Sequence, residues 1–130
     1  MSKTKIASRS FKVSDNMFKL LTGAVHELSN TDKKFHTFRS VIERTIKCLD
    51  DHVFAPDDFH DFISEYALSG PIIVHLRMET CLNERLTALK GKLQEKCGIP
   101  VYDRTAIAYF VDLCTVRKLY CKPVDRKNSA

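Results

Sequence analysis

The chain has 130 residues, of which 44% are hydrophobic and 28% are charged, proportions that suit a single domain over residues 1–130 with a core of its own. No apolar run is long enough to cross a bilayer, and the N-terminus lacks the apolar stretch of a signal peptide. We therefore expect no membrane association and a location in the reducing cytoplasm. The net charge is +5.

Basic residues gather at the two ends of the chain, and acidic residues gather in the middle. The N-terminal basic group comprises Lys3, Lys5, Arg9 and Lys12. The C-terminal basic group comprises Arg117, Lys118, Lys122, Arg126 and Lys127. No Lys or Arg lies between Cys48 and Leu76. This distribution favours one face that meets a polyanion, although an unevenly charged and merely solvated surface gives the same pattern.

The sequence contains no motif typical of catalysis or metal binding. It has no Gly-rich phosphate loop and no nucleophile motif, its five His lie far from metal-ligand spacing, and its five Cys form no CxxC pair. We therefore expect a protein that is not an enzyme and that holds no metal and no cofactor. Four cysteines fall in helical apolar patterns, which predicts buried structural thiols: Cys48, Cys81, Cys97 and Cys114.

The first half of the chain predicts one strand and two helices. Apolar and polar residues alternate over 8–13, which is typical of a strand with Phe11 and Val13 on its inner face. Apolar residues then recur at helical spacing over 15–31 and over 37–51. Asp15 is the predicted N-cap of the first of these helices.

An acidic connector, residues 52–71, follows the first half. Pro56-Asp57-Asp58 is typical of a helix start, and Ser69-Gly70-Pro71 of a helix end. Four residues give this segment an aromatic and apolar face: Phe59, Phe62, Ile63 and Tyr66. We expect a short linker helix that packs on the domain.

The second half predicts a strand and two helices again. Residues 72–78 alternate as a strand, and a helix follows over 80–97, with Thr80 as its predicted N-cap. Gly98 ends that helix, and Pro100 prevents it from resuming at once. A last helix is predicted over 103–120, before a basic tail over 121–130.

The apolar pattern of the second half repeats that of the first at an offset of 65 residues, without a gap. The matching pairs include Val13 and Met78, Met17 and Leu82, Leu21 and Leu86, Leu28 and Leu93, and Ile42 and Ile107. We interpret this as a duplication, with a first unit over 5–51, the linker over 52–71 and a second unit over 72–120.

The two predicted strands need each other, because a lone strand leaves its backbone donors and acceptors without partners. We expect them to pair antiparallel, with the four repeat helices covering one face of the pair. The predicted fold class is thus mostly α with a two-stranded antiparallel β-ribbon. The other face stays exposed, and a two-stranded ribbon fits the major groove of DNA.

The second unit resembles a known family. Ile73-Val74-His75-Leu76-Arg77-Met78, followed by Leu82, Leu86, Leu89 and a helix ending at Gly98, resembles the ribbon-helix-helix (Arc/MetJ-like) superfamily. Two units in one chain imply a tandem pseudo-dimer, similar to the TraY-type relaxosome proteins of conjugation and to the overdrive-binding protein of T-DNA transfer. This sequence departs from the family in its longer first helices and in the Tyr102-Asp103-Arg104 start of its last helix.

The alternation assigns the residues that point out of the ribbon and are predicted to contact bases: Ser8, Ser10, Lys12, Ile73, His75 and Arg77. Arg and Lys suit the acceptors of guanine, Ser reaches several base edges, and Ile contacts a thymine methyl group. Because the two sets differ, the site on double-stranded DNA is expected to be asymmetric. Ordinary solvated strand charge remains the alternative for Lys12 and Arg77, and packing against the linker or a neighbouring molecule for Ile73 and His75.

The resemblance also implies phosphate contacts, since in this family the N-terminus of each short helix faces the DNA backbone. It nominates Lys33, Lys34, His36, Thr37, Phe38 and Arg39 in the first unit, and Asp103, Arg104 and Thr105 in the second. Asp103 suits a phosphate site only if its carboxylate is engaged elsewhere. Lys3, Lys5, Arg126 and Lys127 add charge that serves either DNA or solubility.

Three roles stay open at this point. The tandem arrangement favours an accessory factor in conjugative or T-DNA-type transfer, whereas a transcriptional repressor is the commoner role of the superfamily. A protein-interaction adaptor is the third. In that role the connector aromatics, including Phe54, would dock a relaxase, a coupling protein or further copies of the chain, unless they are buried on its own core.

Overall fold

The computed structural model describes residues 5–117, and the centre of this part is a two-stranded ribbon. Strand β1 (Ile6–Val13) pairs antiparallel with β2 (Ile72–Glu79). The helices are α1 (Asp15–Asp32), α2 (Phe38–Cys48), α3 (Pro56–Glu65), α4 (Thr80–Cys97) and α5 (Asp103–Val111). The prediction of a mostly helical chain with one two-stranded antiparallel sheet is confirmed. Within residues 5–117 no helix combines the length and the apolar character needed to cross a membrane.

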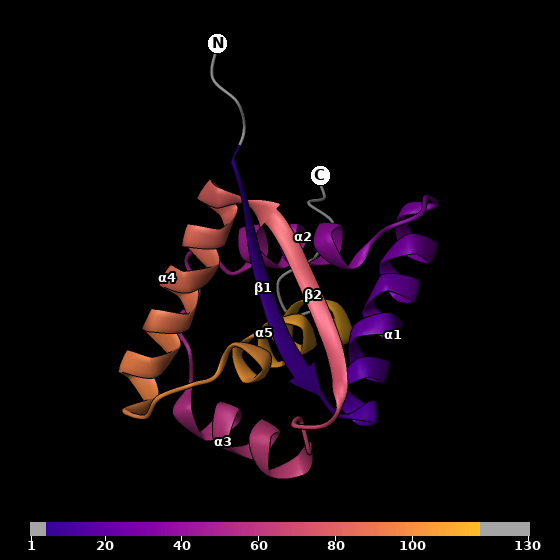
Figure 1. Ribbon diagram of the computed structural model, residues 1–130. Coiled ribbons are helices and arrows are strands. Elements are labelled where there is room, and N and C mark those ends of the chain that lie inside the picture. The colour runs from indigo at the N-terminus through magenta and orange to yellow at the C-terminus, as the bar shows by residue number, and fades with distance from the viewer. Residues whose placement is uncertain (1–4, 118–130) are drawn as a thin grey trace, which may run out of the picture.

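The helices leave one face of the ribbon uncovered. Helices α1 and α4 flank the ribbon on opposite sides, α2 and α5 lie behind it, and α3 lies beyond one end (Figure 1). The inner side chains of the strands that meet these helices are buried, namely Phe11, Val13, Leu76 and Met78. The period-two pattern of both strands therefore directs these four side chains into the core and the alternate side chains toward solvent.

The ends of the long helices recur at the 65-residue offset. Helices α1 and α4 begin and end 65 residues apart, and each is closed by a residue in the left-handed conformation, Lys33 with φ 59° and Gly98 with φ 72°. Glycine adopts this conformation without strain, so Gly98 is the expected residue there and Lys33 is the costly one.

Both predicted N-caps are wrong by one residue. Ser14 caps α1, because its hydroxyl accepts a hydrogen bond from the Met17 N–H at 3.0 Å, and Asp15 is the first helical residue. Glu79 precedes α4 without a side-chain cap, and Thr80 is helical. The strand runs directly into α4, so no residue is left between them to adopt a capping turn.

The short helices end earlier than predicted. Helix α2 stops at Cys48, and the chain turns through residues 49–51. Helix α5 stops at Val111 and continues as a π-helical turn, η1 (Asp112–Val116), in which the Arg117 N–H donates to the Asp112 carbonyl at 2.8 Å. The last predicted helical residues, 118–120, and the basic tail lie outside the described residues.

The linker packs closely on the domain. The Ser14 N–H donates to the Leu68 carbonyl at 2.8 Å, which joins the linker to the end of β1. A Cβ at Gly70 would lie 2.5 Å from the Ser14 Cα, so this approach requires glycine. Phe54, Phe59 and Phe62 are buried. Their burial contradicts the docking hypothesis that needs these three rings on the surface.

The prediction of four buried thiols is wrong for Cys81, which is exposed on α4, whereas Cys114 is buried. Cys48 and Cys97 are half-buried. Cys81 lies directly before Leu82 at the start of α4. Leu82 belongs to the apolar stripe of this helix that packs on the core, and Cys81 lies outside that stripe. Burial raises the pKa of the Cys97 thiol, which favours its protonated form.

Candidate nucleic-acid interface

The uncovered face of the ribbon carries all the residues predicted to contact bases. Three come from β1 and three from β2, and each is exposed: Ser8, Ser10, Lys12, Ile73, His75 and Arg77. The exposure of Ile73 and His75 contradicts the alternative that they pack against the linker. The register places Ser8 opposite Arg77 and Lys12 opposite Ile73.

Ser10 and His75 form the centre of this face. They lie opposite each other in the register, and the Ser10 Oγ is 2.8 Å from the His75 Nδ1. They are also separated by 65 residues, so they are the pair of repeat-related positions that the sheet brings face to face. Arg77 lies opposite Ser8, four residues along β1 from Lys12, which separates the two cations by roughly 13 Å along the strands.

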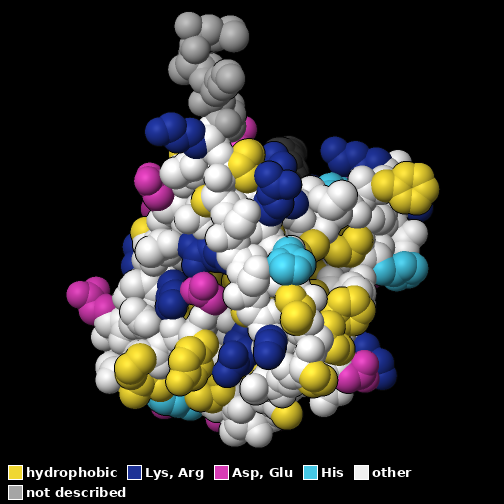
Figure 2. Space-filling model, in the orientation of Figure 1, with side chains coloured by type: hydrophobic (Ala, Val, Ile, Leu, Met, Phe, Trp, Pro, Cys, Tyr) yellow, Lys and Arg dark blue, Asp and Glu magenta, His cyan; other side chains and the backbone are white. Residues whose placement is uncertain are grey.

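The electrostatics of this face are predominantly positive. Figure 2 shows Lys and Arg side chains above and below the middle of the ribbon, with a His between them. Lys5, Lys12 and Arg77 are exposed on or beside the strands. The described residues give none of these three an ion-pair partner. Exposed cations without a carboxylate partner remain available to an anion.

At the start of α2, the predicted phosphate residues fall into two groups. Lys33 and Lys34 are exposed, and Arg39 is exposed although it pairs with Glu43 at 3.0 Å. Thr37 acts as the N-cap, because its Oγ1 accepts from the Ser40 N–H at 3.1 Å. The His36 ring is buried and so is not placed to meet a phosphate.

His36 instead holds the loop before α2 in position. Its Nε2 lies 2.8 Å from an Asp32 carboxylate oxygen, and its Nδ1 lies 2.9 Å from the Ser40 Oγ. The Arg44 guanidinium donates to the same Asp32 oxygen at 2.6 Å. The hydrogen bond from His36 and the charge of Arg44 lower the pKa of Asp32. Sequence reasoning missed this role because it depends on the three-dimensional closure of the loop.

At the start of α5, Arg104 and Thr105 are half-buried, and the Arg104 guanidinium lies 4.9 Å from the centre of the Tyr102 ring. Asp103 is engaged by two cations, with the Arg9 Nη1 and the Lys90 Nζ each 3.0 Å from its Oδ1. Burial raises the pKa of Asp103, but the hydrogen bond from Lys90 and the charge of Arg9 outweigh it and lower the value. The Asp103 carboxylate is therefore engaged by other residues, which is the condition under which Asp103 suits a phosphate site.

Arg9 is a second residue whose role sequence reasoning missed. It was grouped with the basic N-terminal segment, but its side chain turns inward and donates to the Asn83 Oδ1 at 2.6 Å as well as to Asp103. The strand alternation contains the signal, since Arg9 shares the inner face with Phe11. Of the other nominated cations, Lys5 is exposed, and Lys3, Arg126 and Lys127 lie outside the described residues.

Comparison of the chain with family models, with curated proteins and with solved structures finds no match. The geometry of the ribbon face is therefore the basis for inferring a function.

Proposed function

We propose that this protein binds double-stranded DNA selectively by inserting its ribbon into the major groove. The observation that carries the proposal is the uncovered ribbon face, on which Lys12 and Arg77 are both exposed. The major groove of B-DNA is about 12 Å wide and admits a two-stranded ribbon. Two cations roughly 13 Å apart along the strands can reach bases about four steps apart.

We further propose that the chain is a tandem ribbon-helix-helix pseudo-dimer. The 65-residue offset relates the bounds of α1 and α4, their left-handed caps, and the central Ser10 and His75. A two-fold axis through that central pair would exchange Lys12 with Arg77 and the start of α2 with the start of α5. Each helix start then meets one DNA strand, with Arg39 and Arg104 as matching phosphate contacts.

In the cell we propose an accessory role in conjugative or T-DNA-type transfer, with a relaxase or coupling protein as partner. The support is the fusion of two non-identical units, which suits a single asymmetric site rather than a set of palindromic operators. Repression of transcription is the competing role. Neighbouring relaxase or secretion genes favour the first role, and a lone divergent operon favours the second.

The test of DNA recognition is a double variant, Lys12→Ala with Arg77→Ala. A duplex selected from a random pool supplies the specific site, and a scrambled duplex supplies the reference. We expect the ratio of the two affinities to fall tenfold or more, because each good base contact discriminates by about 1–3 kcal/mol. Affinity for the selected duplex should also fall steeply with salt, because binding releases counterions.

The matched control removes two cations from helix surfaces outside the ribbon, Lys47→Ala with Lys92→Ala. Its net charge equals that of the test variant, so it controls for the change in net charge alone. An unchanged affinity ratio in the ribbon variant, with normal circular dichroism, contradicts the assignment of the ribbon to base contacts.

A further inference from the structure

The loop between α1 and α2 presents an aromatic ring to solvent on a backbone that is held in place. Phe35 is fully exposed, and its neighbours Lys33 and Lys34 are exposed as well. The N–H of Lys34 donates to the Ser29 carbonyl at 3.2 Å, and the N–H of His36 donates to the Ser29 Oγ at 2.9 Å. A group whose backbone is already ordered loses less entropy when it docks, so this loop suits a contact with a partner.

The two lysines give this loop a positive charge that the protein does not neutralise. Within residues 5–117 neither Lys33 nor Lys34 has an ion-pair partner. Asp32, the acid next to them in the sequence, is engaged by His36 at 2.8 Å and by Arg44 at 2.6 Å. A partner that meets both the ring and the cations has to offer negative charge and apolar surface together. Duplex DNA offers both, through its phosphates and its deoxyribose rings.

The loop is continuous with the interface proposed above. Phe35 precedes Thr37, the N-cap of α2, and Arg39 follows in the first turn of that helix. The loop lies beside the ribbon, farther out than the start of α2 (Figure 1), and Figure 2 shows hydrophobic and basic side chains together over it on the face that presents the ribbon. A DNA strand that borders the major groove has the minor groove on its other side. With the start of α2 on that strand, the loop lies toward the minor groove.

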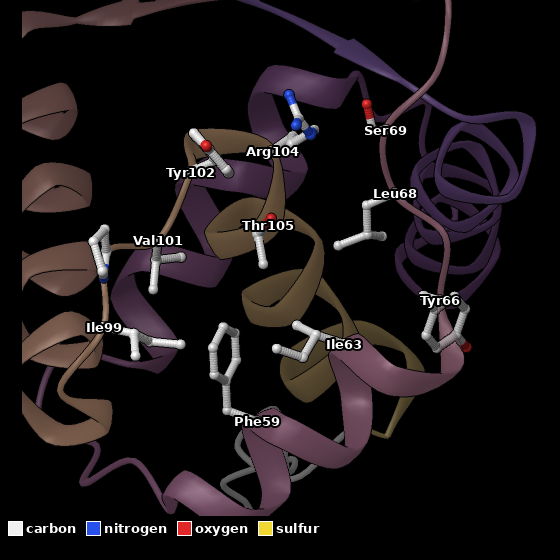
Figure 3. Close-up of a pocket in the computed structure, with 11 residues that line it drawn as sticks. Phe59, Ile63, Tyr66, Leu68, Ser69, Ile99, Val101, Tyr102, Arg104 and Thr105 are labelled. Atoms are coloured by element: carbon white, nitrogen blue, oxygen red, sulfur yellow. The ribbon is translucent and has the colours of Figure 1, made fainter.

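The corresponding loop of the second unit, between α4 and α5, has different chemistry. At the 65-residue offset, the counterparts of Lys33, Lys34 and Phe35 are Gly98, Ile99 and Pro100. The Ile99 side chain extends toward Phe59 of α3 at the wall of a cavity (Figure 3). Tyr102, the exposed aromatic residue of this loop, lies against the Arg104 guanidinium, which is 4.9 Å from its ring centre. Of the two loops, only that of the first unit combines a freely exposed ring with lysines.

We propose that the α1–α2 loop extends the DNA site on one side only. The Phe35 ring packs against deoxyribose in the minor groove next to the bases that the ribbon reads, and Lys33 and Lys34 contact the phosphates that border it. This inference rests on the proposed DNA binding. It makes the footprint longer at the end of the site that meets the first unit.

The experiment measures affinity for duplexes that carry one selected site with long flanks, or with one or the other flank cut back to the edge of the selected motif. Wild-type affinity should fall about fivefold or more when one flank is cut back and change less than about twofold when the other is, because only one flank meets the loop. A triple variant, Lys33→Gly with Lys34→Ala and Phe35→Ala, should lose this difference between the flanks.

The matched control removes the same net charge and one exposed apolar side chain elsewhere, with Lys47→Ala, Lys92→Ala and Val53→Ala. It should keep the difference between the flanks.

Single variants separate the ring from the charge. Lys33 has φ 59°, a conformation that glycine adopts without strain, so Lys33→Gly keeps the loop and removes one cation. It should lower the slope of log affinity against log salt by about 0.9, the share of one phosphate contact. Phe35→Ala removes no charge, so it should weaken binding to the long duplex at an unchanged slope. Hydroxyl-radical cleavage, which reports the exposure of deoxyribose, should show protection beyond one end of the motif that Phe35→Ala loses.

Three outcomes each overturn the inference: equal sensitivity of the wild-type protein to the two flanks, a flank difference that survives in the triple variant, or wild-type affinity and footprint in Phe35→Ala. The last outcome would assign the ring to a partner other than DNA. Absence of any binding to the selected site by wild-type protein instead contradicts the proposed function.

Discussion

The two flanks of the ribbon have the same backbone arrangement, but polar side chains form one flank and apolar side chains form the other. On the α4 side, Arg9 reaches from β1 and donates to Asn83, to the Thr87 Oγ1 at 2.5 Å and to Asp103, which also accepts from Lys90. The Arg9 side chain is largely buried in this polar network. It joins β1, α4 and the start of α5 through charge-assisted hydrogen bonds.

On the α1 side, the positions 65 residues away from that network are apolar apart from one threonine: Val74, Phe18, Thr22, Phe38 and Val25. Together with Leu21 they line an open pocket of about 220 Å³. Val74 is too short to fill the space that Arg9 fills on the other side. The same backbone thus accommodates a polar hydrogen-bond network on the α4 flank and an apolar pocket on the α1 flank. The starts of α5 and α2, which we propose to meet DNA, are therefore held by different kinds of contact.

The largest expected effect on stability comes from disrupting the polar network with Arg9→Met. The change keeps much of the side-chain length but leaves Asp103 with Lys90 alone and Asn83 without its donor. We expect the free energy of unfolding to fall by about 2–3 kcal/mol, because bonds to charged groups each contribute about 1.5–3 kcal/mol. Urea unfolding measures it. Lys12→Met, an exposed cation on the same strand, should change it by less than about 0.5 kcal/mol, and equal losses would contradict the comparison.

A second test introduces the counterparts of Arg9 and Asp103 on the apolar flank. Val74→Arg alone should destabilise by about 2 kcal/mol, because it brings a charge into an apolar pocket. Phe38→Asp supplies the acid that corresponds to Asp103. A double-mutant cycle should then give a favourable coupling of about 1 kcal/mol between the two substitutions. Strict additivity would show that the flanks differ in backbone geometry as well as in side chains.

Much of the architecture was predictable because it depends on local periodicity. Alternation in 8–13 and 72–78 predicted both strands and the exposed side of each, and the left-handed Gly98 ended α4 as expected. These features depend on neighbouring residues in the chain, and so a sequence pattern contains them.

The features that the sequence did not predict depend on distant partners or on how a loop closes. Arg9 and Asp103 are 94 residues apart, so the strand alternation indicates that Arg9 points inward but not that it pairs with Asp103. His36 was nominated for phosphate because it precedes a helix, yet the closed loop buries its ring against Asp32. The 65-residue offset contains a further signal, since it pairs Arg9 with Val74 and Asp103 with Phe38.

The smallest expected effect is a difference in acid sensitivity between the flanks. The folded pKa of Asp103 lies below its ordinary value of 3.8, so the unfolded chain binds more protons in this range. The stability that the carboxylate contributes is therefore present above about pH 4 and is lost as the pH falls through the folded pKa. Phe38, the counterpart on the other flank, does not titrate.

Asp103→Asn isolates the stability that the Asp103 carboxylate contributes. The lowered pKa values of Asp32 and Asp58 affect the variant and the wild-type protein alike. At pH 7 the variant should be less stable than wild type, by less than the loss expected for Arg9→Met, because Lys90 and Arg9 keep other partners or reach solvent. As the pH falls below 3.8, urea unfolding of the two proteins should converge, since the wild-type carboxyl becomes protonated. A stability difference that stays constant from pH 7 to pH 3 would mean that Asp103 contributes through its shape and hydrogen bonds and not through its charge.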